Sequence, residues 1–433
     1  MQNYIKNSKF FSYFSFENIL VFLSCLTVLG LIYSRFLLSL SMFLWLIASL
    51  KSKREESIFQ HSVLQKVTNY FTDFFKNKDF IVVTLFFFTV LISGFWSEDM
   101  RYFSERLRIR LPFLLMPLAF AWLVPISKKI YHTTFYFLIA LLSLTMIGVL
   151  VHYSQDFEAI NESLLRGKNI PVPMNHIRFS LLLAFSTIVG FILWKKEDFD
   201  KQWKKNSLMA SIIFLFASLH ILAVRSGIAC FYLTVIMLGV RYIFLSKKYF
   251  LIVALLVFSI GIPSLSYVFF PSIKKKVEYA FFDFEQFRAG NGANYSDAER
   301  IGSIMAGLKV GNDSPILGCG YGDLEKEVSI AYKEVFPQEK EPKIPHNQYI
   351  MTYAGLGTIG LFIFLFAYLF PIFYKKNYQE PIFLALNIIT GLSFMVEGTI
   401  ETQVGTAFYV YFLCLGLNYL KNVQSSQRNE MTN

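Results

Sequence analysis

His346 is the side chain in this sequence that is best suited to proton transfer. It follows Pro345, precedes Asn347 and stands at the start of a long apolar run. An unperturbed imidazole has a pKa of about 6.5, so at a water boundary it can take a proton from a hydroxyl group at ambient pH. Asn347 could orient the imidazole or bind the substrate. His346 is therefore a candidate general base.

Arg178 and Arg225 could hold an anion, because each lies within a residue or two of an apolar run. A charge at that depth is costly unless it is paired or faces a polar cavity. The guanidinium fork binds phosphate or carboxylate through two hydrogen bonds. Four of the six histidines fall on the side that these arginines share: His152, His176, His220 and His346. Each alone is better explained as a histidine bound to backbone, but their convergence with the arginines predicts a polar site.

Other charged residues leave alternatives open. The segment SEDMRYFSERLRIRL has an amphipathic helical pattern, and its arginines could bind lipid phosphate or a functional anion: Arg101, Arg106, Arg108 and Arg110. Glu397 and Glu401 could tune His346, pair with an arginine or simply lie at the interface. The triplets at 156–158 and 198–200 have the form of cation ligands, but the second lies in a lysine-rich connector and both are more simply solvated charges.

Composition shows which elements must position these residues. Of the 433 residues, 55% are hydrophobic and 16% are charged, and the mean hydropathy is +0.46. An ordinary soluble domain has roughly 25% charged residues. The chain has more apolar side chain than a soluble fold could bury, so the bilayer must solvate much of it. This excludes a disordered chain, a collagen-like chain and a disulfide-stapled module. The net charge of +11 then indicates cytoplasmic loops rather than a nucleic-acid partner.

The apolar runs predict an all-α polytopic membrane protein with about twelve transmembrane helices. They lie near 17–33, 35–50, 79–96, 111–126, 130–152, 176–194, 207–223, 226–245, 249–270, 347–374, 380–397 and 404–420. The expected organisation is nine helices in residues 1–270, a large outer loop with short helices at 271–346, three helices in 347–421 and a tail at 422–433. The N-terminus reads as a retained signal anchor.

The distribution of cations predicts the orientation. With the N-terminus inside, the inner connectors and tails carry 22 Lys and Arg, and the short outer connectors carry 9. The long loop is left out, because long loops translocate largely regardless of charge. Lysine makes up 19 of the inner cations, whereas 8 of the 9 outer ones are arginine. Both termini are therefore expected in the cytoplasm, with the arginines on the opposite face.

The long loop between the ninth and tenth runs should contain two helices and a glycine-rich turn. Residues 295–311 and 323–336 have helical patterns, and the sequence SPILGCGYGD lies between them. The turn lacks the strand and lysine of a phosphate-binding P-loop. Arg288 and Arg300 add two arginines above the membrane, and the prolines at 342 and 345 direct the chain back to His346.

The motif around His346 resembles the signature of the O-antigen ligase and O-antigen polymerase superfamily, H-[N/S/Q]-x9-G-x2-[G/T/Y]. His346 and Asn347 are followed by Gly357 and Gly360 at the required spacing. The sequence PILGCGYGDL is similar to a turn of that family. AVRSG resembles its arginine motif, with the serine on the other side of Arg225. The resemblance covers roughly residues 170–410.

The resemblance implies a metal-independent membrane glycosyltransferase without a cofactor. The donor would be a glycan on undecaprenyl diphosphate at the periplasmic face of the inner membrane. His346 would deprotonate the acceptor hydroxyl, and Arg225, with Arg178 and Arg300, would hold the diphosphate. His176 and Asn347 would assist in binding. The main reading is a ligase that transfers the glycan to lipid A–core, and a repeat-unit polymerase is the alternative. A membrane transporter is the reading from another class, but it would show repeat symmetry and ionisable residues at the midplane.

Overall fold

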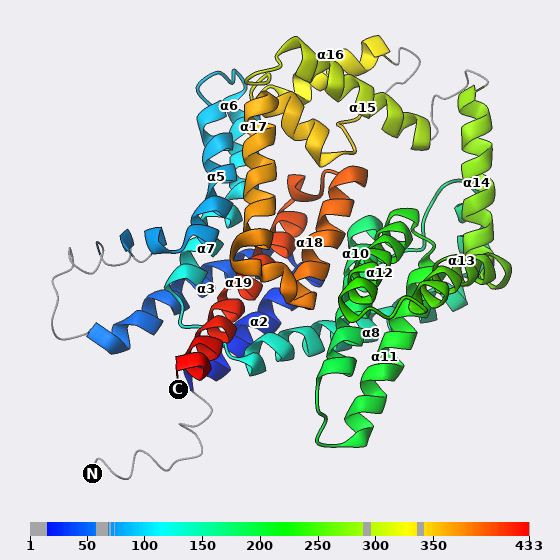
Figure 1. The fold of residues 1–433 in the computed structure, drawn as a ribbon. Helices are drawn as coiled ribbons and strands as arrows, with labels where there is room; N and C mark the ends of the chain where they lie inside the picture. The colour runs from blue at the N-terminus through cyan, green and yellow to red at the C-terminus, as the bar shows by residue number, and fades with distance from the viewer. Residues whose placement is uncertain are drawn as a thin grey trace.

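The computed structural model describes residues 15–57, 68, 71–72, 74–288, 296–335 and 342–432. All regular structure in these ranges is helical, as the sequence predicts (Figure 1). Residues 1–14, which begin the expected signal anchor, lie outside the described residues, and so does the side chain of Arg288.

The helices follow the predicted apolar runs closely. The first half of the chain forms α2 (Phe16–Tyr33), α3 (Arg35–Ser57), α5 (Lys78–Ser93), α6 (Met100–Arg110), α7 (Pro112–Trp122), α8 (Lys128–Gln155), α9 (Phe157–Leu165), α10 (His176–Lys196) and α11 (Gln202–Leu222). The second half forms α12 (Arg225–Ser246), α13 (Leu251–Phe269), α14 (Pro271–Arg288), α15 (Ser296–Asp313), α16 (Leu324–Val335), α17 (Gln348–Phe373), η2 (Tyr374–Gln379), α18 (Pro381–Val396), η3 (Thr399–Glu401) and α19 (Gln403–Thr432). A helix lies on each of the twelve predicted runs.

Seven of the described helices are long and apolar enough to cross a bilayer: α2, α8, α10, α11, α12, α13 and α17. Two shorter apolar helices occupy Arg35–Leu50 and Pro381–Val396. The prediction of an all-α membrane protein is therefore confirmed. The count of about twelve spans and the outer position of the loop at 271–346 stay predictions.

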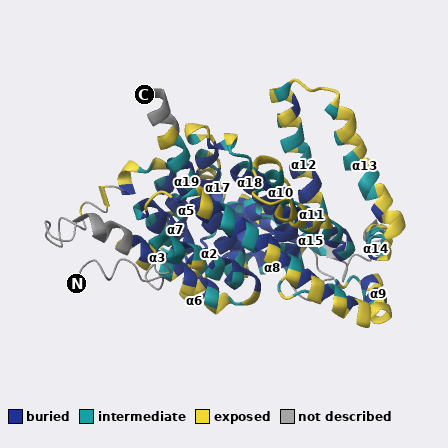
Figure 2. Ribbon diagram, turned by 90° about the horizontal axis from the view of Figure 1, so that it is seen from below, coloured by how far each residue is buried: buried dark blue, intermediate teal, exposed yellow. Residues whose placement is uncertain are grey.

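Helix α19 lies at the centre of the packed core. Its residues from Ala407 to Leu415 are all buried, and its Phe412 ring stacks on Phe135 with the centroids 5.4 Å apart. By contrast, only 6% of the residues in the apolar stretch of α13 are buried. Figure 2 shows α12 and α13 projecting from the packed helices with much of α13 exposed. Apolar side chains on such a surface are expected for a helix solvated by lipid.

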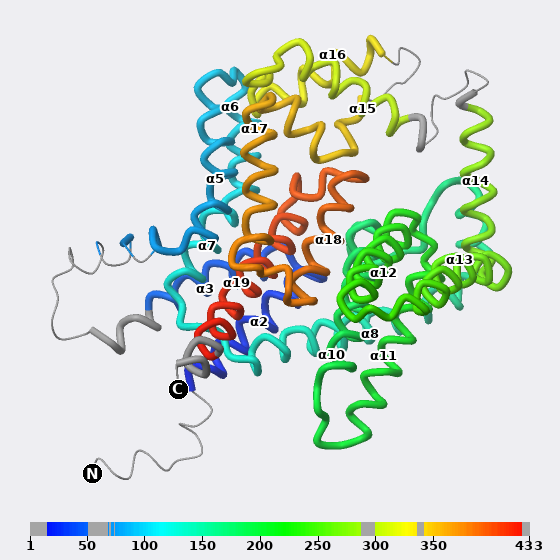
Figure 3. Tube along the Cα trace, in the orientation of Figure 1, coloured from blue at the N-terminus to red at the C-terminus, as the bar shows by residue number. Residues whose placement is uncertain are grey.

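Helices α15 and α16 lie across the upper end of α17 in Figure 1, where α15 packs against both α16 and α17. Both helices were predicted inside the loop, and the structure adds α14, which rises at the edge of the molecule in Figure 3. The amphipathic spacing of Ile273, Val277, Phe281 and Phe284 was the signal that could have predicted it. Within the segment at 271–346, α15 and α16 thus form a helical cap over this end of α17.

Helix α17 is broken at Gly357, where φ is 65° and ψ is −167°. The glycine-rich turn fills the break. Cys319 N–H donates to Ala354 O at 3.0 Å and Gly320 N–H to Gly355 O at 3.1 Å, while Thr358 N–H donates to Pro315 O at 2.8 Å. The turn therefore satisfies backbone groups that a continuous helix would pair internally. The two glycine motifs noted in the sequence lie in direct contact.

Candidate functional site

His346 lies immediately before α17, where two neighbouring side chains hold the chain. Asn347 caps the helix, its Oδ1 accepting Ile350 N–H at 3.1 Å, and its Nδ2 donates to Met395 O at 3.1 Å. The backbone N–H of His346 donates to Ser303 Oγ at 3.3 Å. Among the described residues none forms a hydrogen bond with the imidazole of His346. Asn347 is already engaged with protein at both of its polar atoms, which favours its orienting role.

The imidazole of His346 stands among cations. Burial and then the charges of Arg300 and Lys343 lower its pKa to about 4, well below the ordinary value expected from the sequence. The ring is therefore neutral at physiological pH and ready to accept a proton. Ser303 helps to keep Arg300 nearby, because its hydroxyl donates to Arg300 O at 2.8 Å and accepts the N–H of His346.

Arg178 forms an ion pair with Glu397, with Nη2 and Oε1 2.6 Å apart. Asn175 starts helix α10 beneath it by accepting the N–H groups of Ile177 and Arg178. Burial raises the pKa of the Glu397 carboxyl, while the charges of Arg178 and Arg300 act in the opposite direction. Glu397 Oε2 and Arg178 Nε are buried without a partner among the described residues. Of the roles considered for Glu397, the structure shows pairing with an arginine.

Arg225 opens helix α12 and is exposed. It lies close to Lys276 of α14, whose pKa is lowered to about 8 by burial and by the charge of Arg225. Lys276 in turn donates to the carbonyl groups of Gly167 and Lys168 in the connector that precedes α10. Sequence reasoning did not single out Lys276, because nothing in the pattern of its helix predicts which connector it meets.

His176 lies within the electrostatic influence of Arg178 and Arg300 and also of Lys276. It is the first residue of α10, and the charges of Lys276, Arg300 and Arg178 all act on it. The charge of Arg300 acts on both His346 and His176, and the charge of Arg178 acts on His176. His346, Arg300, Arg178 and His176 are electrostatic neighbours, and Arg225 reaches them through Lys276.

The two other histidines expected on this side have local partners. His220 bonds through one ring nitrogen to Phe216 O and through the other to Tyr232 OH, both at 2.9 Å. His152 lies 3.5 Å from Asp156 on the surface. For these two, the ordinary explanation of a locally bonded histidine holds.

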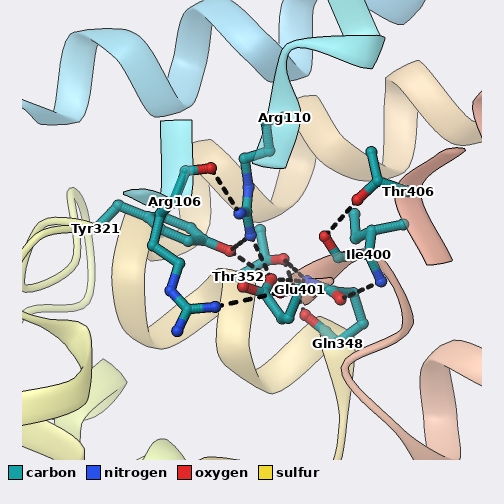
Figure 4. A network of polar contacts seen from close by, with 8 residues as sticks. All are labelled: Arg106, Arg110, Tyr321, Gln348, Thr352, Ile400, Glu401 and Thr406. Carbon is teal, nitrogen blue, oxygen red and sulfur yellow. Dashed lines mark hydrogen bonds and ion pairs between the residues drawn. The ribbon is translucent and has the colours of Figure 1, made fainter. Parts of the chain in front are cut away.

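A second polar network lies inside the protein beside the start of α17 (Figure 4). Arg110 and Glu401 form an ion pair with side chains 0% and 3% exposed. Tyr321 OH and Gln348 Nε2 each donate to Glu401 Oε1 at 2.7 Å, and Arg110 donates to Tyr321 OH. Arg106 donates to the Glu401 carbonyl at 3.2 Å. Burial acts to raise the pKa of Glu401, but Arg110 and the hydrogen bonds outweigh it and the pKa is lowered.

This network corrects the simplest interpretation of the arginine-rich segment. Helix α6 forms as predicted and Arg108 is exposed, but Arg110 points into the protein and not to lipid phosphate. Tyr321 and Gln348 had no recognisable signal in the sequence. Their roles depend on how the glycine-rich turn and α17 pack, which a linear pattern does not encode.

The acidic triplets have no metal-binding geometry. Asp200 pairs with Lys204 at 2.8 Å on the surface, and Asp156 lies beside His152. In the part of the chain that the structure describes, no three His, Cys, Asp or Glu side chains gather as ligands. At His346, a neutral imidazole lies within the electrostatic influence of the Arg300 guanidinium, and this combination is suited to an alcohol attacking a carbon that bears an anionic leaving group.

Comparison with known proteins agrees with this geometry. Residues 209–365 match the family model described as O-antigen ligase. The match runs from α11 into α17, and it includes Arg225, Arg300, His346 and the glycine at the break of α17. The resemblance seen in the sequence is thereby confirmed. Comparison with curated proteins gave no match.

Proposed function

We propose that this membrane protein transfers a glycan from undecaprenyl diphosphate to a hydroxyl group of lipid A–core, and the match of residues 209–365 to the family model described as O-antigen ligase supports the proposal. The observation that carries the proposal is the placement of a neutral His346 beside Arg300, close to Arg178 and His176. A base without arginines would not stabilise a diphosphate leaving group, and arginines without a base would not activate an alcohol.

In the proposed reaction the acceptor oxygen attacks the anomeric carbon of the donor sugar. The bond between that carbon and the diphosphate oxygen breaks, and the hydroxyl proton passes to His346. Arg225 and Arg300 stabilise the charge on the departing diphosphate, with Arg178 supporting them from its ion pair with Glu397. The bound diphosphate would also offset the cations that lower the pKa of His346, so the imidazole becomes a stronger base when the donor is present.

The proposed setting is the inner membrane, with about twelve spans and both termini in the cytoplasm. The lysine-rich inner connectors support this orientation, because cytoplasmic loops carry excess cations. It places the helical cap and the start of α17 at the periplasmic face, where a flipped lipid-linked donor is presented. Metal independence is part of the proposal, since the arginines supply the positive charge.

The test replaces His346 by Ala in cells that lack the native gene, with membrane expression verified. We expect loss of glycan on lipid A–core and accumulation of the undecaprenyl-linked donor. His152→Ala is the matched control, because it removes an exposed histidine at another helix end. Unchanged glycan attachment in His346→Ala would overturn the assignment.

The same experiment separates the ligase from the polymerase. Loss of a ligase leaves long chains on the undecaprenyl carrier and none on the anchor. Loss of a polymerase leaves single repeat units attached to the anchor, and that product would contradict the proposed acceptor. Arg225→Gln should resemble His346→Ala, whereas Arg166→Gln, in the connector after α9, should not.

A further inference from the structure

The network around Glu401 joins four segments that are distant in the sequence. Arg110 belongs to α6, Tyr321 to the glycine-rich turn, Gln348 to α17 and Glu401 to η3. A single carboxylate oxygen, Oε1 of Glu401, receives hydrogen bonds from three of these segments. Its charges are buried, so water cannot replace a lost partner.

The network reaches the proposed base through the backbone. Gln348 is the first residue of α17, two positions after His346, and its amide bridges Glu401 and the N–H of Ile400 at 2.7 and 3.2 Å. Asn347 is bound on the other side to Met395 O. The chain from 346 to 348 is therefore fastened at two points to the segment from 395 to 401.

The glycine-rich turn makes a third attachment. Tyr321 carries the network into that turn, and the turn is hydrogen-bonded to the break in α17. Asp323, at the end of the turn, accepts the N–H groups of Glu98 and Asp99 at 2.8 and 3.0 Å, which holds the start of α6. The glycine-rich turn is therefore bonded to the start of α6 and to the break in α17 by hydrogen bonds that do not involve Glu401.

We propose that Glu401, together with Arg110 and Gln348, is a positioning residue that holds His346 at the register needed for base catalysis. The expected effect on transfer rests on the proposed function, whereas the expected effect on the position of His346 does not. None of these side chains needs to touch the donor or acceptor. A misplacement of about 1 Å remote from the chemistry can lower a rate by about 10²-fold, which is the scale of effect expected here.

Two variants test the role while limiting the risk of misfolding. Gln348→Met keeps the length of the side chain and removes its hydrogen bonds. Arg110→Met combined with Glu401→Leu removes both buried charges together, which avoids leaving one charge unpaired. Asn418→Leu is the matched control: Asn418 is equally buried and bonds Phe120 O and Ile126 N–H at 2.7 Å, but it lies in α19 away from His346.

Transfer is measured per amount of folded protein, together with binding of undecaprenyl diphosphate to the full-length protein in nanodiscs. We expect Gln348→Met and the double variant to lower transfer by about 10²-fold with binding of the lipid diphosphate unchanged. Asn418→Leu should leave both values unchanged. Loss of transfer that only parallels loss of folded protein, equally in the control, would overturn the inference.

A second readout does not depend on activity. The chain has six histidines, so the imidazole signal of His346 can be assigned in histidine-labelled protein by its loss in His346→Ala. Its chemical shift and titration should change in Gln348→Met and stay unchanged in Asn418→Leu. An unchanged His346 signal in Gln348→Met overturns the positioning role. If His346→Ala retains transfer, the proposed function fails, and the signal then decides only whether Gln348 holds the His346 side chain in place.

Discussion

Replacing Gly357 by Ala should strongly destabilise the protein, because alanine at this position would be both strained and crowded. The backbone at Gly357 has φ 65° and ψ −167°, a region that is essentially restricted to glycine. A Cβ there would lie 2.2 Å from Ile316 O and 2.3 Å from Ile316 C, both backbone atoms of the glycine-rich turn. A rotamer change cannot relieve contacts with backbone, so the turn itself must move.

The magnitude follows from these two effects. Holding alanine in this conformation costs about 1–3 kcal/mol. Moving the turn would break the hydrogen bonds from Thr358 N–H to Pro315 O and from Ile359 N–H to Ile316 O, at 2.8 and 3.3 Å. Each is worth about 1 kcal/mol. We therefore expect a loss of about 3–5 kcal/mol in the free energy of unfolding, a large share of the roughly 5–15 kcal/mol typical of a folded protein.

The assay is equilibrium unfolding in mixed micelles with increasing SDS. Gly148→Ala in α8 is the control, because its Cβ meets nothing within 4 Å and helical alanine is better than glycine by about 0.5–1 kcal/mol. Gly357→Ala should unfold at a clearly lower SDS fraction than Gly148→Ala. Its transfer activity should also fall, because His346 directly precedes α17 and depends on that helix for its position. Equal midpoints for the two variants would refute the claim that the turn and the break in α17 depend on each other.

Three further outcomes are expected. Protonating His346 removes the base, and in the donor-free protein the pKa of His346 lies at about 4. Transfer in nanodiscs, measured at donor concentrations far below saturation, should therefore fall only as the pH drops through about 4; an inflection near pH 6.5 under these conditions would contradict the burial and charges seen around the imidazole. Glu397→Leu alone should lower the free energy of unfolding by about 3 kcal/mol, because it leaves the poorly solvated charge of Arg178 unpaired. In a double-mutant cycle, the same change should cost less when Arg178→Met is already present, and additive losses would show that the pair is not coupled. Lys276→Met should increase hydrogen exchange in the connector around Gly167 without affecting α19. Unchanged exchange in that connector would show that the hydrogen bond from Lys276 to Gly167 O does not hold it in place.

Much of the architecture was predictable because membrane helices follow from local composition. Runs of apolar residues gave the helices, since a segment in lipid must satisfy its own backbone groups. The helices at 295–311 and 323–336 and the glycine-rich turn between them were also predicted, and α15 and α16 confirm the helices. Helix α14 was not predicted, although its amphipathic spacing was present in the sequence.

The candidate site was only partly predictable. The spacing of His346, Asn347 and two glycines is a local property and could be recognised in the linear sequence. The partner of each glutamate could not be recognised. Arg110 is 291 positions from Glu401, and Arg178 is 219 positions from Glu397. Many arrangements of the same helices would have left these four residues at the same membrane boundary.

The amino-acid sequence thus determined the helices, and it supplied the candidate base and the candidate anion ligands. The packing of the helices determined which of those charges are neutralised within the protein. Arg110 is fully buried against Glu401, and Arg178 is paired with Glu397. The physical reason is that hydropathy depends on each segment alone, but the free energy of a charge depends on whichever distant segment is folded against it.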